Sequence, residues 1–373
     1  MTYLGEDIRK LGFGLMRLPM KDGNVDIEQT KQMVDLFMEK GFTYFDTAYG
    51  YIGGKSEMAI KEALVDRYPR ESFQLATKLP AWAGPTNVQE AQDMFWTSLK
   101  RTGVEYFDFY LLHNLGGDRT AAFDDYGIWD FLAEQKAQGR IKHLGFSMHA
   151  KADDLDKVLQ AHPEMEFVQL QINYADWESE TVQSRKCYEV ARKHGKPVVI
   201  MEPVKGGNLA ELPEPVSSVF TDASPDASLS SWAIRFAASL EGIVTVLSGM
   251  SNLEQMKDNL SYMDNFQPLT EQEQAVVKKA QEALSKLPQV PCTDCQYCVK
   301  GCPQNIAIPG TFRAMNTYLI YNNLAGARGD YMWETHAAAK ASECIACGQC
   351  EMACPQNIAI IEELAKAVQM LEV

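Results

Sequence analysis

The chain of 373 residues contains no long apolar run and no cluster of basic residues. No stretch reaches the eighteen or so apolar residues that a membrane-spanning helix needs, which argues against a membrane span. Lys and Arg number 35 against 50 Asp and Glu. The formal net charge of -15 disfavours nucleic acid and anionic membrane surfaces as partners, because both repel an acidic protein. The N-terminal residues also lack a charged start followed by an apolar run, so we expect a cytoplasmic protein.

Cysteine is nearly absent outside one stretch: Cys187 stands alone, and the other eight lie between Cys292 and Cys354. These eight form two copies of Cys-x2-Cys-x2-Cys-x3-Cys-Pro. Three thiolates two residues apart can surround one iron–sulfur cubane, while the fourth, followed by a Pro that turns the chain away, reaches a second cluster. By this crossed rule, one [4Fe-4S] cluster takes Cys292, Cys295, Cys298 and Cys354, and the other takes Cys344, Cys347, Cys350 and Cys302.

Zinc sites and disulfides are the alternatives for these cysteines. Zinc sites usually consist of two-Cys knuckles, and disulfides need an oxidising compartment. The stretch resembles bacterial two-cluster ferredoxins, except that about forty residues separate its two copies. This insert has Phe312, Met315 and Tyr318 at helical spacing, and residues 335–340 are helix-forming. We therefore expect a mostly helical cluster domain.

Short apolar runs alternate with helix-length amphipathic segments from Arg9 to about Met250, which is the pattern of βα units around a parallel sheet. The predicted strands are residues 12–18, 43–46, 73–78, 107–113, 142–147, 167–171, 198–201 and 243–247. The predicted helices are residues 27–40, 55–67, 87–102, 125–138, 152–161, 179–194, 226–240 and 252–264. Eight of each predict a (β/α)8 TIM barrel. A doubly wound sheet is the alternative, but no Gly-x-Gly-x-x-Gly follows an early strand.

One more helix is predicted from Thr270 to Leu287, and the run from Pro288 to Pro291 then breaks the chain. A chain of 373 residues is long enough for one large domain and a small one. We therefore expect a barrel over residues 1–287 and a ferredoxin-like domain with two [4Fe-4S] clusters over residues 288–373.

Four side chains suited to proton transfer fall at or just after the ends of predicted strands, where barrels carry their chemistry. Asp46 ends one strand and precedes Tyr51, while Lys78 and His113 end the next two. A Lys78 ammonium beside the phenol favours phenolate and lowers the pKa of Tyr51, and Asp46 fixes Lys78. Tyr51 can then protonate a carbonyl oxygen as hydride reaches its carbon. Each residue alone is more often structural, and only the set predicts a site.

The runs Phe45-Asp-Thr-Ala-Tyr-Gly-Tyr51, Thr77-Lys78 and Leu111-Leu-His-Asn114 resemble the aldo-keto reductase family, over about residues 8–265. The resemblance implies that Tyr51 is the general acid and that His113 orients the carbonyl. It implies that Lys78 is the pKa partner of Tyr51 and that Asp46 is the partner of Lys78. It also implies a small-molecule carbonyl or alcohol substrate.

The resemblance further implies a nicotinamide cofactor, NADP(H) or NAD(H). Ser147 and Gln169 match strands that hold the nicotinamide amide, but Met201 stands where the family usually stacks an aromatic ring. The loop after the last strand has only Lys257 as a basic residue, although an adenosine 2′-phosphate favours cations. The expected cofactor-binding residues are Ser147, Gln169, Asn173, Met201, Ser248, Ser251, Gln255 and Asn259.

A hydride carrier moves two electrons at once and a [4Fe-4S] cluster moves one, so coupling them needs a mediator such as a flavin. The sequence has no recognisable flavin motif. The first hypothesis is a carbonyl reductase whose clusters exchange electrons with the site or with a redox partner protein. The second is a cluster-fed reductase that uses a flavin or direct electron transfer without nicotinamide. The third is a non-enzymatic electron carrier or redox sensor on a barrel scaffold, against which the four-residue site argues.

Overall fold

The computed structural model describes residues 3–373, which form two compact units. The barrel unit comprises the chain up to Lys205 together with Ser230–Glu271. The C-terminal unit comprises Gly206–Leu229 and Gln272–Val373. Both units are discontinuous in sequence, because helix α8 (Glu214–Ala223) groups with the C-terminal unit. The expected boundary between a barrel domain and a cluster domain at residue 288 stays a prediction.

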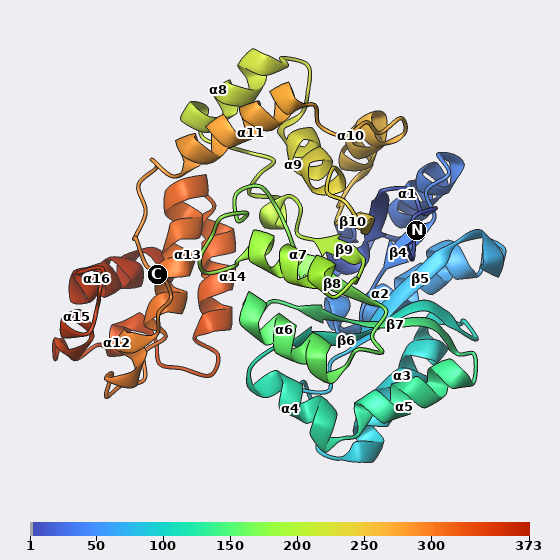
Figure 1. Ribbon diagram of the computed structural model, residues 1–373, viewed down its shortest axis with the longest axis horizontal. Coiled ribbons are helices and arrows are strands. Elements are labelled where there is room, and N and C mark those ends of the chain that lie inside the picture. Colours follow the sequence, from blue (N-terminus) through green and yellow to red (C-terminus); the bar gives the residue numbers. More distant parts are fainter. Residues whose placement is uncertain (1–2) are drawn as a thin grey trace. The chain divides into compact units, whose positions relative to one another are not determined.

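Eight parallel strands close into a ring, which confirms the predicted (β/α)8 barrel (Figure 1). The ring closes because β1 pairs with both β4 and β10. Since all eight strands are parallel, their C-terminal ends share one mouth, where barrels carry their sites. The strands are β1 (Leu11–Gly14), β4 (Tyr44–Asp46), β5 (Gln74–Leu79), β6 (Phe107–Leu115), β7 (Ile141–Met148), β8 (Phe167–Gln171), β9 (Val198–Met201) and β10 (Ile243–Ser248).

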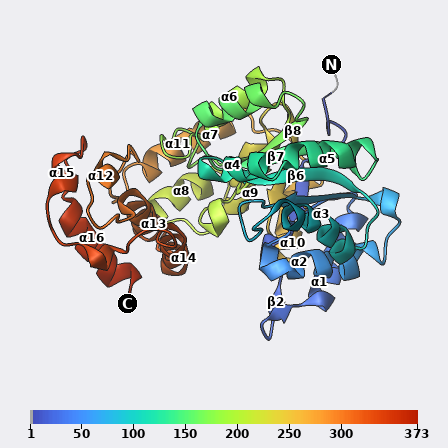
Figure 2. The ribbon, with the colours of Figure 1, turned by 90° about the horizontal axis from the view of Figure 1, so that it is seen from below.

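Helices follow the strands and lie on the outside of the ring (Figures 1 and 2). The first is capped as its sequence predicts, because Asp26 Oδ1 accepts a hydrogen bond from the Gln29 N–H at 3.1 Å. Phe37 of this helix packs on Phe45 of β4 with ring centroids 5.3 Å apart. The helices are α1 (Ile27–Glu39), α2 (Lys55–Ile60), α3 (Val88–Thr102), α4 (Asp118–Asp125), α5 (Ile128–Ala137), α6 (Ala152–Ala161), α7 (Ser184–Lys193), α9 (Leu229–Ala238) and α10 (Leu253–Met263).

The first predicted strand, residues 12–18, is too long. β1 ends at Gly14, and Leu15–Arg17 form a 3-10 helix before the chain enters a small hairpin of β2 (Met20–Lys21) and β3 (Asn24–Val25). The Asp22-Gly23 turn of this hairpin has positive φ at both residues, as the Asp-Gly pair predicts.

Two predicted helical segments are also partly wrong. The helix expected from residue 179 begins at Ser184, because the Ser179 hydroxyl accepts from the Thr181 and Val182 N–H groups and holds the preceding loop. Residues 335–340 are not helical: Ala339 pairs with Ile306 in a parallel bridge, and its N–H donates to Asn305 O at 3.0 Å. A tertiary pairing therefore overrides the helix propensity of this run.

The C-terminal unit is mostly helical, as expected, and has its own core around Phe312, Met315 and Leu364. Its short helices α12 and α15, one from each cysteine repeat, contact each other and lie side by side (Figures 1 and 2). Between residues 3 and 373, no helix is both long and apolar enough to cross a membrane. Besides α8, the helices here are α11 (Glu271–Leu284), α12 (Tyr297–Lys300), α13 (Ile308–Tyr321), α14 (Leu324–Glu334), α15 (Gln349–Met352) and α16 (Ile360–Leu371).

Candidate active site and cluster sites

The barrel mouth brings Asp46, Tyr51, Lys78 and His113 together. Asp46 ends β4, Lys78 lies near the end of β5, and His113 lies in β6, so neighbouring strands supply three of the four. The Lys78 Nζ atom lies 4.8 Å from the centroid of the Tyr51 ring. The rings of Tyr51 and His113 meet edge to face with centroids 5.9 Å apart. A phenol thus lies between an ammonium group and an imidazole.

Lys78 is fully buried and forms an ion pair with the buried Asp46. Its Nζ also donates to Thr47 O at 2.8 Å. Burial acts to lower the pKa of Lys78, but the charge and hydrogen bond of Asp46 outweigh it and raise this pKa above 10.5. Lys78 is therefore an ammonium at neutral pH, held at a fixed distance from the phenol.

The pKa of Tyr51 differs in direction from the sequence-based expectation. Burial raises the pKa of Tyr51 above 10.0, and Lys78 opposes this rise without cancelling it. Asp46 and Glu202 add to the rise through their negative charge. The phenol consequently keeps its proton at neutral pH, which is the form that a proton donor needs.

His113 is held as a neutral imidazole. Burial lowers its pKa well below 6.5, and the neighbouring cations Lys78 and Arg119 lower it further. The Trp82 Nε1–H donates to the His113 carbonyl oxygen at 2.7 Å, which fixes the backbone here. A neutral imidazole can donate one hydrogen bond to a substrate oxygen.

Two of the expected cofactor residues, Ser147 of β7 and Gln169 of β8, are direct partners in the strand register. Ser147 Oγ accepts a hydrogen bond from the Asn114 N–H at 2.8 Å. Gln169 Oε1 and Asn114 Oδ1 are buried without a hydrogen-bond partner among residues 3–373. Buried polar atoms without partners are costly, so these residues fit a ligand with amide donors, such as a nicotinamide carboxamide.

Two further expected cofactor residues lie nearby. Met201 receives a hydrogen bond on its sulfur from Gln169 Nε2 at 3.5 Å. The Asn173 side chain holds the loop before α7: its Nδ2 donates to Asp176 Oδ2 and its Oδ1 accepts from the Asp176 N–H, both at 2.9 Å. Lys205 Nζ binds the same Asp176 carboxylate at 2.7 Å. Cofactor contacts from Met201 and Asn173 stay predictions.

The remaining expected residues lie around the start of α10 and bond to one another. Asn259 Nδ2 donates to Ser248 Oγ at 2.6 Å, and the Ser251 N–H donates to Gln255 Oε1 at 2.7 Å. These polar groups therefore have partners inside the protein. A nucleotide that used the Ser248, Gln255 or Asn259 side chain would have to replace its present bond, whereas Ser251 takes part through its backbone N–H.

Arg17 and Arg119 were missed by the sequence analysis. A Cβ on Gly249 of the β10 loop would lie 3.8 Å from the Cβ of Arg17, so the Arg17 residue lies beside this loop. Arg119 lies in α4 and acts electrostatically on His113. The only sequence signal was a basic residue shortly after a strand, which is too common to single out.

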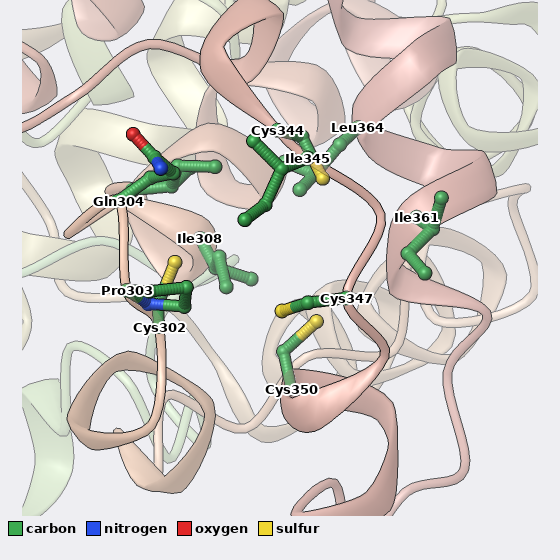
Figure 3. A pocket seen from close by; sticks show the side chains of 11 residues that line it. Cys302, Pro303, Gln304, Ile308, Cys344, Ile345, Cys347, Cys350, Ile361 and Leu364 are labelled. Atoms are coloured by element: carbon green, nitrogen blue, oxygen red, sulfur yellow. The ribbon is translucent and has the colours of Figure 1, made fainter.

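The eight clustered cysteines line two cavities in the C-terminal unit. One cavity is lined by Cys292, Cys295, Cys298 and Cys354, and the other by Cys302, Cys344, Cys347 and Cys350. Each set thus combines three cysteines of one repeat with the last cysteine of the other. Figure 3 shows the sulfur atoms of Cys302, Cys347 and Cys350 facing a common space. This donor set fits the thiolate ligation of a [4Fe-4S] cluster.

Apolar side chains such as Ile308 and Leu364 complete the wall of the second cavity. Burial raises the pKa of the Cys298 thiol to about 11, and it also raises the pKa of Cys350. Iron binding at these thiols must therefore displace protons. Among the described residues, no group of three or more His, Cys, Asp and Glu side chains is arranged to hold a single metal ion. Cys187, outside both sets, is buried.

A closed parallel barrel whose mouth brings together a Tyr, a Lys, an Asp and a His has the architecture of a βα-barrel oxidoreductase. The model of the aldo/keto reductase family matches residues 10–282, and the chain belongs to this family. A 4Fe-4S dicluster domain matches residues 291–359, the part that contains both cysteine repeats.

Individual relatives match at low identity. A probable aldo-keto reductase 1 from Glycine max is 30% identical over 182 residues, which span 46% of this chain and 50% of that protein. The uncharacterised oxidoreductase YqkF from Bacillus subtilis is 23% identical over 296 residues, covering 72% of this chain and 90% of that protein.

Solved structures share the barrel fold. Aldo-keto reductase AKR11C1 from Bacillus halodurans, in its holo form, has a TM-score of 0.60 at 24% identity and covers 75% of this chain and 95% of its own. An aldo-keto reductase from Klebsiella pneumoniae in complex with NADPH has a TM-score of 0.56 at 19% identity, covering 73% of this chain and 90% of its own. At these identities the likeness shows the fold alone.

Proposed function

We propose that this protein is an iron–sulfur aldo-keto reductase that reduces a carbonyl, or oxidises an alcohol, with Tyr51 as the proton-transferring acid. The observation that carries the proposal is the position of the Tyr51 phenol, with the Lys78 ammonium 4.8 Å from its ring centroid and the His113 ring at 5.9 Å. Family membership and the buried Lys78–Asp46 pair support it.

In the reducing direction, the Tyr51 hydroxyl gives its proton to the substrate oxygen while the carbonyl carbon accepts a hydride, so one C–H and one O–H bond replace the C=O π bond. Lys78 stabilises the phenolate that Tyr51 becomes, and Asp46 keeps Lys78 charged and in place. Neutral His113 donates a hydrogen bond that orients the substrate oxygen. When bound, a nicotinamide supplies the hydride.

Gln169 and Asn114 would hold the carboxamide of a nicotinamide, because the side-chain oxygen of each is buried without a partner between residues 3 and 373. Ser147, whose Oγ accepts from the Asn114 N–H, would contact the carboxamide beside them. NADP(H) and NAD(H) are both candidates. The NADPH complex of the Klebsiella pneumoniae protein supports the first, and Arg17 and Lys257 would supply the cations for a phosphate.

The two thiol-lined cavities would hold two [4Fe-4S] clusters, ligated across the repeats as the crossed rule predicts. When bound, such clusters carry single electrons, which they would exchange with a redox partner protein or with the barrel site. The alternative of a cluster-fed reductase, with a flavin or with direct electron transfer and no nicotinamide, has one observation in its favour: the Ser248–Asn259 and Ser251–Gln255 bonds occupy the expected nucleotide loop.

The test uses anaerobically purified protein with its released cofactors identified and a panel of aldehydes as substrates. Tyr51→Phe should lower nicotinamide-dependent turnover roughly 10²- to 10⁴-fold, the usual contribution of general acid catalysis, and leave the iron and sulfide content unchanged. Tyr49→Phe is the matched control, because Tyr49 lies in the same loop but packs on Arg101, whose guanidinium carbon is 4.4 Å from its ring centroid. Unchanged turnover in Tyr51→Phe would contradict the proposal, and no binding of NADPH or NADH in a fluorescence titration would favour the alternative.

A further inference from the structure

Arg119 is a partly buried cation beside the proposed catalytic residues. Its Nε donates to Asn114 O at 2.8 Å, and its guanidinium carbon lies 6.0 Å from the centroid of the Trp82 ring. Within residues 3–373, Arg119 forms no ion pair, and its two terminal nitrogens have no hydrogen-bond partner. The Arg119 side chain is thus held through its Nε atom, while its two terminal nitrogens can donate hydrogen bonds to a ligand.

This arrangement costs free energy in the absence of a ligand. Burial lowers the pKa of Arg119, and no carboxylate offsets that effect. Two other partly buried guanidinium groups of the barrel unit do have an acidic partner: Arg70 pairs with Asp108, and Arg101 pairs with Glu57 at 3.3 Å. A partly desolvated guanidinium without an acidic partner is stabilised when an anion binds to it.

The position of Arg119 relates it to the reacting groups. Arg119 lies against Trp82. The Trp82 indole N–H donates to the His113 carbonyl oxygen, and the centroids of the Trp82 and His113 rings are 6.5 Å apart. The His113 ring in turn meets the Tyr51 ring. Arg119, Trp82, His113 and Tyr51 therefore form a continuous row of neighbours along the mouth.

The charges around this row are unevenly distributed. The charged groups that act on His113 are the cations Lys78 and Arg119. The acids that act on Tyr51 are Asp46, which is paired with Lys78, and Glu202. Because Asp46 neutralises Lys78, Arg119 is left as the cation on the His113 side of the mouth that no carboxylate offsets.

We propose that the natural substrate is an aldehyde or ketone that carries a carboxylate, which the terminal nitrogens of Arg119 bind while Trp82 packs against the carbon chain. The inference rests on the proposed carbonyl chemistry and names its substrate class. A planar guanidinium with two adjacent N–H donors matches a carboxylate in shape and in its single charge. A phosphate, with nearly two charges, would leave one uncompensated at this single guanidinium.

The experiment compares two aldehydes that differ only in charge, 4-carboxybenzaldehyde and its neutral methyl ester, with the anaerobically purified full-length protein. The wild type should have the higher kcat/KM for the carboxylate. Arg119→Met should lower kcat/KM for the carboxylate roughly 10- to 100-fold more than for the ester, through KM, because a hydrogen bond to a charged group is lost only with the carboxylate. Arg119→Lys, which keeps the charge but loses the fork, should recover part of this loss.

Arg140→Met is the matched control, because Arg140 precedes β7 and so lies at the opposite end of the barrel; it should not change the ratio between the two aldehydes. Equal kcat/KM for both aldehydes in the wild type, or an equal loss of both in Arg119→Met, would overturn the inference. If Arg119→Met does not fold, Arg119→Lys and the wild-type ratio decide.

A binding measurement separates this inference from the proposed function. Benzoate binding by calorimetry should be measurable in the wild type and weakened at least tenfold in Arg119→Met. If neither aldehyde is reduced, the proposed function fails, and benzoate binding that depends on Arg119 would still support the anion site. Absence of benzoate binding to the wild type would overturn that site as well.

Discussion

The barrel mouth and the cluster cavities bring their functional groups together in opposite ways. Asp46, Lys78 and His113 come from three strands, and the closed ring of strand pairing holds them in place. The cluster cysteines lie in two short repeats whose helices, α12 and α15, have only four residues each. The scaffold therefore builds the barrel mouth without a ligand, whereas helices of this length need other contacts to persist. We infer that iron–sulfur ligation supplies those contacts.

This comparison predicts that iron removal affects the C-terminal unit alone. Anaerobic chelation should destabilise it by on the order of 10 kcal/mol, as for other small metal-folded domains, and should leave the barrel folded. Hydrogen exchange followed by mass spectrometry checks this, with α13 and α16 losing protection while β5 and β6 keep theirs. Retained protection in α13 and α16 would break the comparison.

A smaller effect is expected when one cavity loses one ligand. Cys354→Ala should remove about half of the iron and sulfide, because Cys354 lines only the cavity of Cys292, Cys295 and Cys298. Thiol alkylation should then label those three cysteines first.

Preferential labelling of Cys344, Cys347 and Cys350 would instead show ligation within one repeat. Cys187 is the internal control, because its thiol is buried and its pKa is raised to about 11.

On the barrel side, Lys78→Met leaves the buried Asp46 carboxylate without its partner. The barrel should lose roughly 3–5 kcal/mol of unfolding free energy, the usual cost of breaking a buried pair. Urea denaturation followed by tryptophan fluorescence measures this.

Lys142→Met is the control, because Lys142 is half exposed and its partner Asp108 keeps a second ion pair with Arg70. It should cost no more than about 1 kcal/mol. Similar losses in both variants would mean that Lys78 contributes no more than a surface pair.

The smallest effect concerns pH. The folded-state pKa of His113 lies below its ordinary 6.5, so the unfolded chain binds the extra proton first as pH falls. The stability that neutral His113 contributes is complete above pH 6.5 and is lost below it, by up to about 1.4 kcal/mol per pH unit. The unfolding free energies of the wild type and of His113→Gln should therefore converge as pH falls from 7 to 5, and parallel curves would contradict the shift.

The sequence predicts the ligand sets of the cluster cavities in full, but it predicts the barrel mouth only in part, for a physical reason. The cysteine sets follow from spacing within short repeats, and the same sets line the two cavities. The barrel follows from the alternation of apolar runs and amphipathic helices. The pKa direction of Tyr51 could not be predicted, because the burial that raises it arises only when the barrel closes.

Predictions from local sequence patterns also fail where pairing with a distant segment sets the backbone conformation. Residues 335–340 have helix-forming composition, yet the bridge from Ala339 to Ile306 holds them in another conformation. Arg119 has no distinguishing neighbours in sequence, and its importance depends on Trp82, which precedes it by one βα unit.

The grouping of α8 with the C-terminal unit has a consequence for dissecting this protein. Asn323 Nδ2 donates to Asn208 Oδ1 at 2.7 Å, so residues from the connection between β9 and α9 help to build the unit that contains the cysteines. A fragment that starts at residue 288 would lack Gly206–Leu229, which belong to the C-terminal unit. A truncated barrel that ends at residue 287 would keep Gly206–Leu229 but lose the rest of that unit. The ferredoxin-like part is consequently not separable at residue 288, and transferring it to another enzyme would require including Gly206–Leu229 as well.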